Sequence, residues 1–113
     1  MLKIYHNPKC SKSREGLQIL ESSGKEYEVI LYLIHPPSEV ELQTIISKLG
    51  IPPIDLVRKG ELIWKENYQG KTMTDKEIIA AMAKYPKLME RPIVLSEKKA
   101  VIGRPPENIK ALV

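Results

Sequence analysis

The chain has 113 residues, enough for one hydrophobic core and too few for two, so we expect a single domain over residues 1–113. Its formal charge of +4 comes from 18 basic and 14 acidic residues spread along the whole sequence, which suits an anionic ligand and is too mild for nucleic acid. There is no apolar run of roughly 20 residues and no secretory signal, so we expect a cytoplasmic protein that does not bind membranes.

The first half of the sequence predicts a parallel βαβ unit. Residues 2–5, LKIY, have the composition of a short strand, and residues 14–24, REGLQILESSG, have helical spacing of apolar residues and a closing glycine. Residues 27–33, YEVILYL, are almost continuously apolar, which predicts a strand buried on both faces of a sheet. Such a crossover between parallel strands is right-handed by strong precedent.

Two capping signatures predict the helices of the middle region. Ser38 and Glu41 have the spacing of a capping box, and the helix that they begin closes at Gly50. Thr74 and Glu77 repeat this spacing before a second apolar helical segment. These helices, with a short helical turn in IPPIDLVRKG, form an insertion between the βαβ unit and the remaining strands.

The last part of the chain predicts a hairpin and a helix. Residues 91–96, RPIVLS, and residues 99–103, KAVIG, are two short strands at either end of a charged turn, and residues 105–113 begin a helix with proline in its first turn. The order is β-α-β, inserted helices, then β-β-α. It predicts a thioredoxin-like α/β fold with a mixed four-stranded sheet and helices inserted before the closing hairpin.

The single cysteine, Cys10, lies between the first strand and the first helix, in the stretch HNPKCSKSR. A helix N-terminus favours an anion, and it can lower the pKa of a thiol from about 8.5 to roughly 3.5–7.5. Arg14 lies one helical turn later and adds positive charge, while the hydroxyl of Ser13 can donate a hydrogen bond to the sulfur. His6 lies four residues before Cys10, and we expect it to orient the loop. The pattern predicts a nucleophilic thiolate rather than a buried structural cysteine.

Arginine is scarce, because the basic residues are mostly lysines and the arginines are only Arg14, Arg58, Arg91 and Arg104. A planar guanidinium binds an oxyanion better than the compact ammonium of lysine does. No metal site is expected, since one cysteine and two distant histidines lack ligand spacing.

The stretches YHNPKCSKSR, LVRK, ERPIV and GRPPE resemble the ArsC family, the thioredoxin-fold arsenate reductases that depend on glutathione and glutaredoxin. The catalytic loop of that family, H-x-x-x-C-x-x-S-R, matches His6, Cys10, Ser13 and Arg14. The resemblance implies that Cys10 is the catalytic nucleophile in the reduction of arsenate to arsenite. It also implies a monomer without a bound cofactor, with glutathione as co-substrate and glutaredoxin as partner.

The same resemblance assigns the other arginines. In the family, three arginines from separate segments bind the arsenic oxyanion, and by motif these correspond to Arg58, Arg91 and Arg104. The family also has a cis proline where its third strand begins, and Pro92 occupies that position.

Other functions remain open at this level. A thiol oxidoreductase of the same fold that acts on a glutathione mixed disulfide would keep Cys10 and Arg14 but would need no set of oxyanion-binding arginines. A non-enzymatic Spx-type regulator that binds RNA polymerase often has Cys-x-x-Cys, where this chain has Ser13. A low-molecular-weight tyrosine phosphatase needs arginine six residues after its cysteine, where this chain has Gly16.

Because Ser13 cannot act as a resolving thiol, a second sulfur must come from solution. We therefore expect Cys10 to pass through a mixed disulfide with glutathione.

Overall fold

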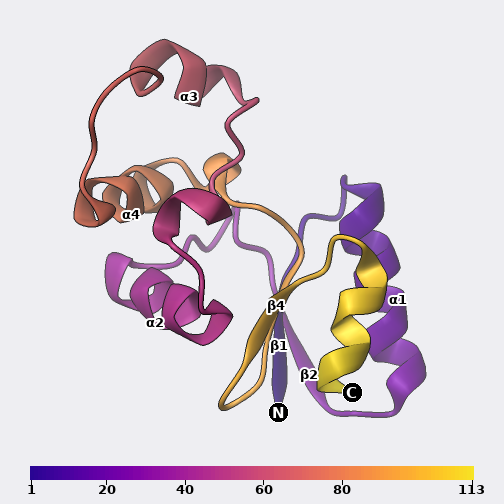
Figure 1. Ribbon diagram of the computed structural model, residues 1–113. Helices are drawn as coiled ribbons and strands as arrows, with labels where there is room; N and C mark the ends of the chain where they lie inside the picture. Colours follow the sequence, from indigo (N-terminus) through magenta and orange to yellow (C-terminus); the bar gives the residue numbers. More distant parts are fainter. The chain divides into compact units, whose positions relative to one another are not determined.

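The computed structural model describes all 113 residues, and they form two compact units (Figure 1). One unit contains residues 1–35 and 91–113, and the other contains residues 36–90. The first unit consists of β1 (Leu2–Tyr5), α1 (Ser11–Ser23), β2 (Tyr27–Ile30), β3 (Ile93–Leu95), β4 (Ala100–Ile102) and the 3₁₀ helix η3 (Pro106–Leu112).

The strands form one sheet with the order β2-β1-β3-β4. β1 pairs in parallel with β2 and antiparallel with β3, and β3 pairs antiparallel with β4. This arrangement confirms the predicted mixed four-stranded sheet of a thioredoxin-like fold. β1 and β3 are therefore the two central strands of the sheet. The loop that carries Cys10 begins where β1 ends.

The helices α1 and η3 lie side by side against this sheet (Figure 1). Their contact with the strands is made by apolar side chains that have lost nearly all solvent exposure, as expected where burial of apolar surface stabilises a fold. The members of this core are Leu2, Ile4, Leu20, Val94 and Ile109.

The prediction for the second strand was wrong in its length and burial. β2 ends at Ile30, and its residues are half-buried or exposed. Beyond it, Leu31 begins a turn in which its carbonyl oxygen accepts from the N–H groups of Ile34 (3.0 Å) and His35 (2.9 Å). The physical reason is the strand order, which places β2 at an edge of the sheet and not in its middle. An apolar run cannot by itself distinguish these two positions.

The C-terminal helix begins with proline as predicted, but it is a 3₁₀ helix over its whole length. The peptide bond before Pro92 is cis, as the family resemblance implied, and the bond between Arg104 and Pro105 is cis as well.

The second unit is helical and contains two capping boxes at the predicted positions. Ser38 precedes α2 and Thr74 precedes α4, and each exchanges hydrogen bonds with the glutamate three residues later. An antiparallel bridge joins Val57, near the middle of this unit, to Met89 near its end. The sequence did not predict α3 or η2. The elements are α2 (Glu39–Leu49), η1 (Pro53–Leu56), α3 (Leu62–Asn67), α4 (Asp75–Lys84) and η2 (Pro86–Leu88).

No helix in the structure combines the length and apolar character that crossing a membrane requires.

Candidate active site

The loop between β1 and α1 places Cys10 at the N-cap position of α1. Asn7 organises the loop: its side-chain Oδ1 accepts from the N–H of Lys9 at 3.0 Å, and its backbone oxygen accepts from the N–H of Cys10 at 3.0 Å. Cys10 has extended backbone angles, and its carbonyl accepts the first helical hydrogen bond from Arg14. The sulfur therefore lies beside the first free N–H groups of the helix, where an anion is favoured.

The pKa of the Cys10 thiol is lower than that of a free cysteine. Partial burial acts to raise this pKa, but stabilisation of the thiolate outweighs it. That stabilisation comes first from hydrogen bonding and charge of the Arg91 side chain, and then from the backbone N–H groups of Ser13 and Lys12. Because the side chain is also partly exposed, Cys10 has the properties of a reactive thiol.

The cation that lowers the pKa of Cys10 is thus Arg91, and the added positive charge expected from Arg14 stays a prediction. The guanidinium of Arg14 instead donates from Nη1 to the carbonyl oxygen of Pro8 at 2.9 Å. This hydrogen bond fastens the loop to the first turn of α1. Sequence spacing places Arg14 one turn from the thiol, but spacing does not determine the direction in which a long side chain extends.

His6 and Ser13 form a buried pair beneath the loop. The Nδ1 of His6 and the Oγ of Ser13 are 2.7 Å apart, and the same Oγ accepts from the N–H of Asn7 at 2.9 Å. The two residues are 5% and 0% exposed, so both need hydrogen-bond partners within the protein. Burial lowers the pKa of His6, hydrogen bonding by Ser13 opposes this, and the charge of Arg14 lowers it further; the net shift is downward and favours a neutral imidazole.

These contacts revise the role predicted for Ser13. Its hydroxyl contacts His6 and Asn7, whereas its backbone N–H acts on the sulfur of Cys10. His6 orients the loop, as the sequence suggested, and it does so through Ser13.

Two glycines determine how closely the segment that carries Arg91 approaches α1. A Cβ atom on Gly16 would lie 2.9 Å from Pro92 and 2.7 Å from Ile109, and one on Gly103 would lie 2.8 Å from each of the same residues. All four distances are shorter than carbon atoms tolerate, so a larger residue at either position would require Pro92 or Ile109 to shift. The close contact at Pro92 positions the preceding Arg91, and sequence reasoning had noted Gly16 only as a position that is not arginine.

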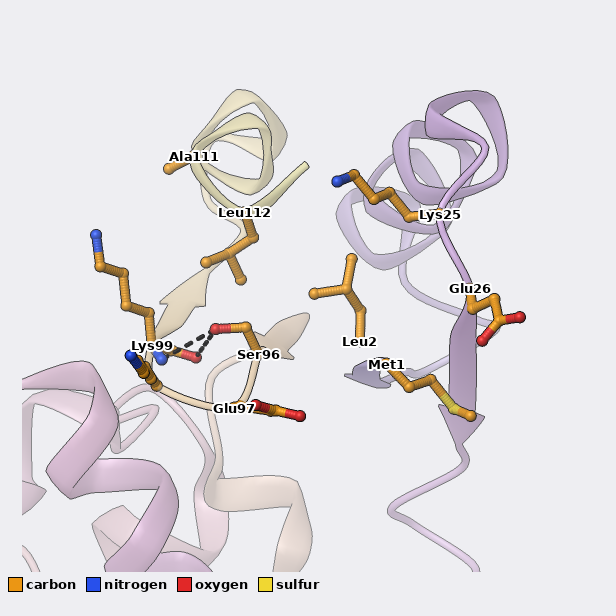
Figure 2. Close-up of a pocket in the computed structure, with 10 residues that line it drawn as sticks. Met1, Leu2, Lys25, Glu26, Ser96, Glu97, Lys99, Ala111 and Leu112 are labelled. Atoms are coloured by element: carbon orange, nitrogen blue, oxygen red, sulfur yellow. Dashed lines mark hydrogen bonds between the residues drawn. The ribbon is translucent and has the colours of Figure 1, made fainter.

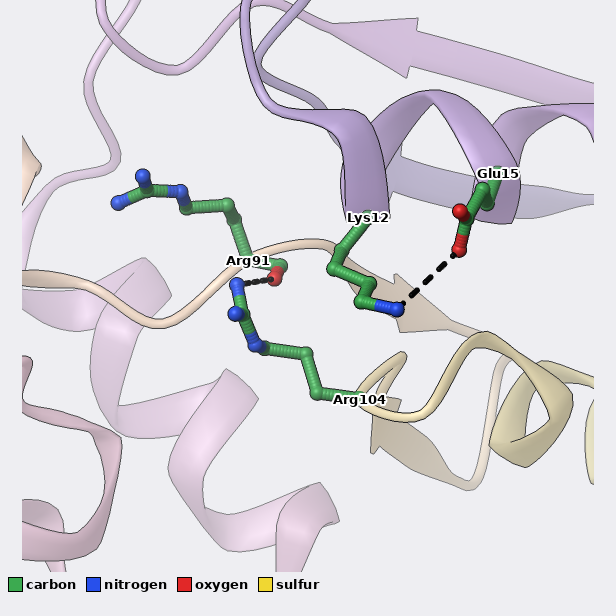
Figure 3. A network of polar contacts seen from close by, with 4 residues as sticks. All are labelled: Lys12, Glu15, Arg91 and Arg104. Carbon is green, nitrogen blue, oxygen red and sulfur yellow. Dashed lines mark hydrogen bonds and ion pairs between the residues drawn. The ribbon is translucent and has the colours of Figure 1, made fainter.

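Arg104 contacts the backbone of Arg91. Its Nη1 donates to the carbonyl oxygen of Arg91 at 3.3 Å, while the side chain of Arg91 extends in another direction (Figure 3). Nearby, Lys12 and Glu15 form an exposed ion pair on α1 at 3.6 Å (Figure 3). The contact of Arg104 supports Arg91, and binding of an oxyanion by Arg104 stays a prediction.

Arg58 belongs to the unit of residues 36–90. Its guanidinium forms an ion pair with Glu61 at 3.6 Å, and its backbone N–H donates to the carbonyl oxygen of Leu88 at 2.7 Å. Its predicted part in oxyanion binding stays a prediction.

Tyr32 is a residue of this site that sequence reasoning missed. It follows β2, is 1% exposed, and its hydroxyl has no hydrogen-bond partner. Cys10, Arg91 and Asn7 all influence the pKa of this hydroxyl, so Tyr32 lies among them. The sequence offered no signal for this role, because a tyrosine in an apolar run is most simply a packing residue.

An open pocket of about 630 Å³ lies at the other end of the sheet, where β1 begins and the β3–β4 hairpin turns (Figure 2). Its floor is apolar and includes Leu2 and Leu112, and lysines and glutamates surround it. It contains no cysteine, so the loop of Cys10 remains the candidate active site. No group of three or more His, Cys, Asp or Glu side chains is arranged to hold a metal ion.

Comparison with known proteins supports this assignment. A protein of Escherichia coli K12 named uncharacterized protein YfgD is 46% identical over 114 aligned residues, covering 99% of this chain and 96% of its own. A protein of Neisseria meningitidis serogroup A named arsenate reductase is 42% identical, covering 99% of this chain and 97% of its own. The solved structure of an arsenate reductase from Vibrio cholerae superposes with a TM-score of 0.94 at 44% identity, covering 99% of this chain and 97% of that one.

The family model for the ArsC family matches residues 5–112, which include the whole loop from His6 to Arg14 and the arginines at positions 58, 91 and 104. The chain belongs to the ArsC family.

Proposed function

We propose that this protein is an arsenate reductase that uses Cys10 as its nucleophile and glutathione with glutaredoxin as its source of electrons. One observation carries the proposal: the thiol of Cys10 has a lowered pKa because it faces Arg91 and the N–H groups that begin α1. The same groups that stabilise a thiolate can stabilise a negatively charged tetrahedral oxyanion bound next to it. The relatives named arsenate reductase support arsenate as that oxyanion.

In the first step, the Cys10 thiolate attacks the arsenic atom. A sulfur–arsenic bond forms, an arsenic–oxygen bond breaks, and the departing oxygen takes up protons and leaves as water. Arg91 is placed to balance the negative charge that remains on the other oxygens.

In the second step, a glutathione thiolate attacks the sulfur of Cys10. A disulfide forms, the sulfur–arsenic bond breaks, and its electron pair stays on arsenic, which is thereby reduced from As(V) to As(III). Because this chain has only one cysteine, the second sulfur comes from glutathione. A glutaredoxin thiolate then attacks the glutathione sulfur and releases the Cys10 thiolate.

The test is arsenate reduction by the purified protein with glutathione and glutaredoxin, followed by omission of each component. Turnover should require both thiol components, and the stalled enzyme should show the mass of one glutathione on Cys10. Absence of arsenate reduction would contradict the proposal. Reduction of a glutathione mixed disulfide by a protein that is inactive on arsenate would favour a thiol oxidoreductase of the same fold.

A further inference from the structure

Tyr32 lies beside the active-site loop because of the pairing of β1 with β2. Ile30 is the last residue of β2, and it is paired with Tyr5, the last residue of β1. The N–H of His6 then donates to the carbonyl oxygen of Ile30 at 2.9 Å. The two chain segments therefore leave the sheet together, one toward Cys10 and the other toward Tyr32.

The hydroxyl of Tyr32 is buried and has no hydrogen-bond partner, and the same is true of the Nε of Arg91. Buried polar atoms in proteins almost always have such partners, so two unpartnered atoms in one small region require an explanation. The tyrosine side chain is 1% exposed, which excludes bulk solvent as a partner.

The side chains that influence the Tyr32 hydroxyl are Arg91, Asn7 and Cys10. Arg91 has only N–H groups to offer. The Oδ1 of Asn7 already accepts from the N–H of Lys9, and the amide nitrogen of Asn7 can only donate. Neither side chain forms a hydrogen bond of proper geometry with the hydroxyl. Neither the hydroxyl proton of Tyr32 nor the Nε–H of Arg91 has an acceptor.

The hydroxyl keeps its proton under ordinary conditions. Burial raises its pKa, and the negative charge of Cys10 adds to this effect, whereas the charge of Arg91 opposes it. A neutral, buried hydroxyl next to a cation can donate a hydrogen bond to an anion without first losing a shell of water.

We propose that Tyr32 is a further catalytic residue, whose hydroxyl donates a hydrogen bond to an oxygen of the tetrahedral oxyanion bound at Cys10, together with the Nε of Arg91. The inference deepens the proposed function and rests on it for the identity of the anion. Bound arsenate would supply an acceptor for both donors, and because both donor atoms are buried, its binding requires the side chains that cover them to move.

The test compares Tyr32→Phe, which removes only the hydroxyl, with the wild type. Alkylation of Cys10 by iodoacetamide is followed by intact mass in the presence of increasing arsenate, phosphate or sulfate, since a bound oxyanion shields the sulfur. We expect the anion concentration that gives half protection to rise about tenfold in Tyr32→Phe. The melting temperature should stay the same or rise, because the lost hydroxyl had no partner in the folded protein.

Tyr27→Phe is the matched control, since it removes a phenol hydroxyl from the other end of β2, where Tyr27 pairs with Leu2. It should leave the protection unchanged. Equal protection in Tyr32→Phe and the wild type, or no protection of the wild type by any of the three anions, would overturn the inference. The proposed function is judged separately, by arsenate turnover of the wild type with glutathione and glutaredoxin.

Discussion

At the N-termini of α2 and α4, side chains accept hydrogen bonds from the first backbone N–H groups. At the N-terminus of α1, those N–H groups remain available to the sulfur of Cys10. Ser38 accepts from the N–H of Glu41 at 3.1 Å, and the carboxylate of Glu41 accepts in return from the N–H of Ser38 at 3.1 Å. Thr74 and Glu77 repeat this exchange at 3.2 and 2.9 Å. α1 has no capping hydrogen bond from its N-cap side chain and no acidic residue in its first turn.

The difference separates helix ends that stabilise the fold from a helix end that can do chemistry. A capping box satisfies the free N–H groups and adds negative charge where the helix dipole favours it. At α1 neither is present, so the dipole and the N–H groups of Lys12 and Ser13 act on the thiolate instead. The stability that a cap would contribute is absent where reactivity is needed.

Replacing Cys10 with serine should give the largest effect, because it turns the reactive N-cap into a structural one. Arsenate reduction should fall by at least about 10³-fold, since a serine hydroxyl is a far weaker nucleophile than a thiolate. Serine is a good N-cap, so the free energy of unfolding should rise by up to about 1 kcal/mol. Steady-state kinetics and urea unfolding measure the two effects. Retained turnover would remove Cys10 from the mechanism.

Replacing Arg91 with alanine should remove the main stabilisation of the thiolate while leaving the helix end in place. The value of kcat/KM should fall by about 10²-fold. The pKa of Cys10 should rise, so the increase of kcat/KM with pH should move to higher pH, because the reactive thiolate then forms only there. Ultraviolet absorbance of the thiolate against pH checks the shift.

Arg14→Ala is the matched control for this variant. The Arg14 guanidinium donates to the carbonyl oxygen of Pro8, whereas the side-chain cation that lowers the pKa of Cys10 is Arg91. Its loss should therefore shift the thiol titration much less than the loss of Arg91. An equal shift in the two variants would contradict the assignment of Arg91.

Replacing Ser13 with alanine tests how the uncapped end of α1 is held. The change leaves the buried His6 imidazole and the N–H of Asn7 without their shared partner, and such a loss costs about 1–3 kcal/mol of folding free energy. Chemical denaturation gives the value, and Ser22→Ala, at an exposed position of α1, should cost much less. Equal stability of the two variants would show that the buried pair does not hold the loop.

The smallest effect is expected at a conventional cap. Ser38→Ala removes the side-chain half of the capping box of α2 and should lower the free energy of unfolding by about 1 kcal/mol. Arsenate reduction should not change. Ser47→Ala, at an exposed position within α2, controls for the loss of a hydroxyl from the same helix. A loss of activity in Ser38→Ala as large as that in Arg91→Ala would break the distinction between the two kinds of helix end.

Local signals in the sequence determined the elements of the fold and the position of the nucleophile. Capping residues, closing glycines and short apolar runs affect only the residues next to them in sequence. The capping boxes at Ser38 and Thr74 and the end of α1 at Gly24 could therefore be predicted from residue spacing alone. The place of Cys10 between a strand and a helix was likewise a local property. The assignment of Arg58, Arg91 and Arg104 to oxyanion binding came from family resemblance, which local physics alone does not supply, and it stays a prediction.

Only the tertiary structure decided which groups surround the sulfur. Arg91 and Tyr32 come from segments distant in sequence, and the pairing of β1 with β2 and β3 brings them to the loop of Cys10. The direction of the Arg14 side chain and the exposure of β2 depended on contacts of the same long-range kind. Spacing along a chain determines which residues are neighbours in one element, whereas the environment of a thiol is determined by side chains that several elements place around it.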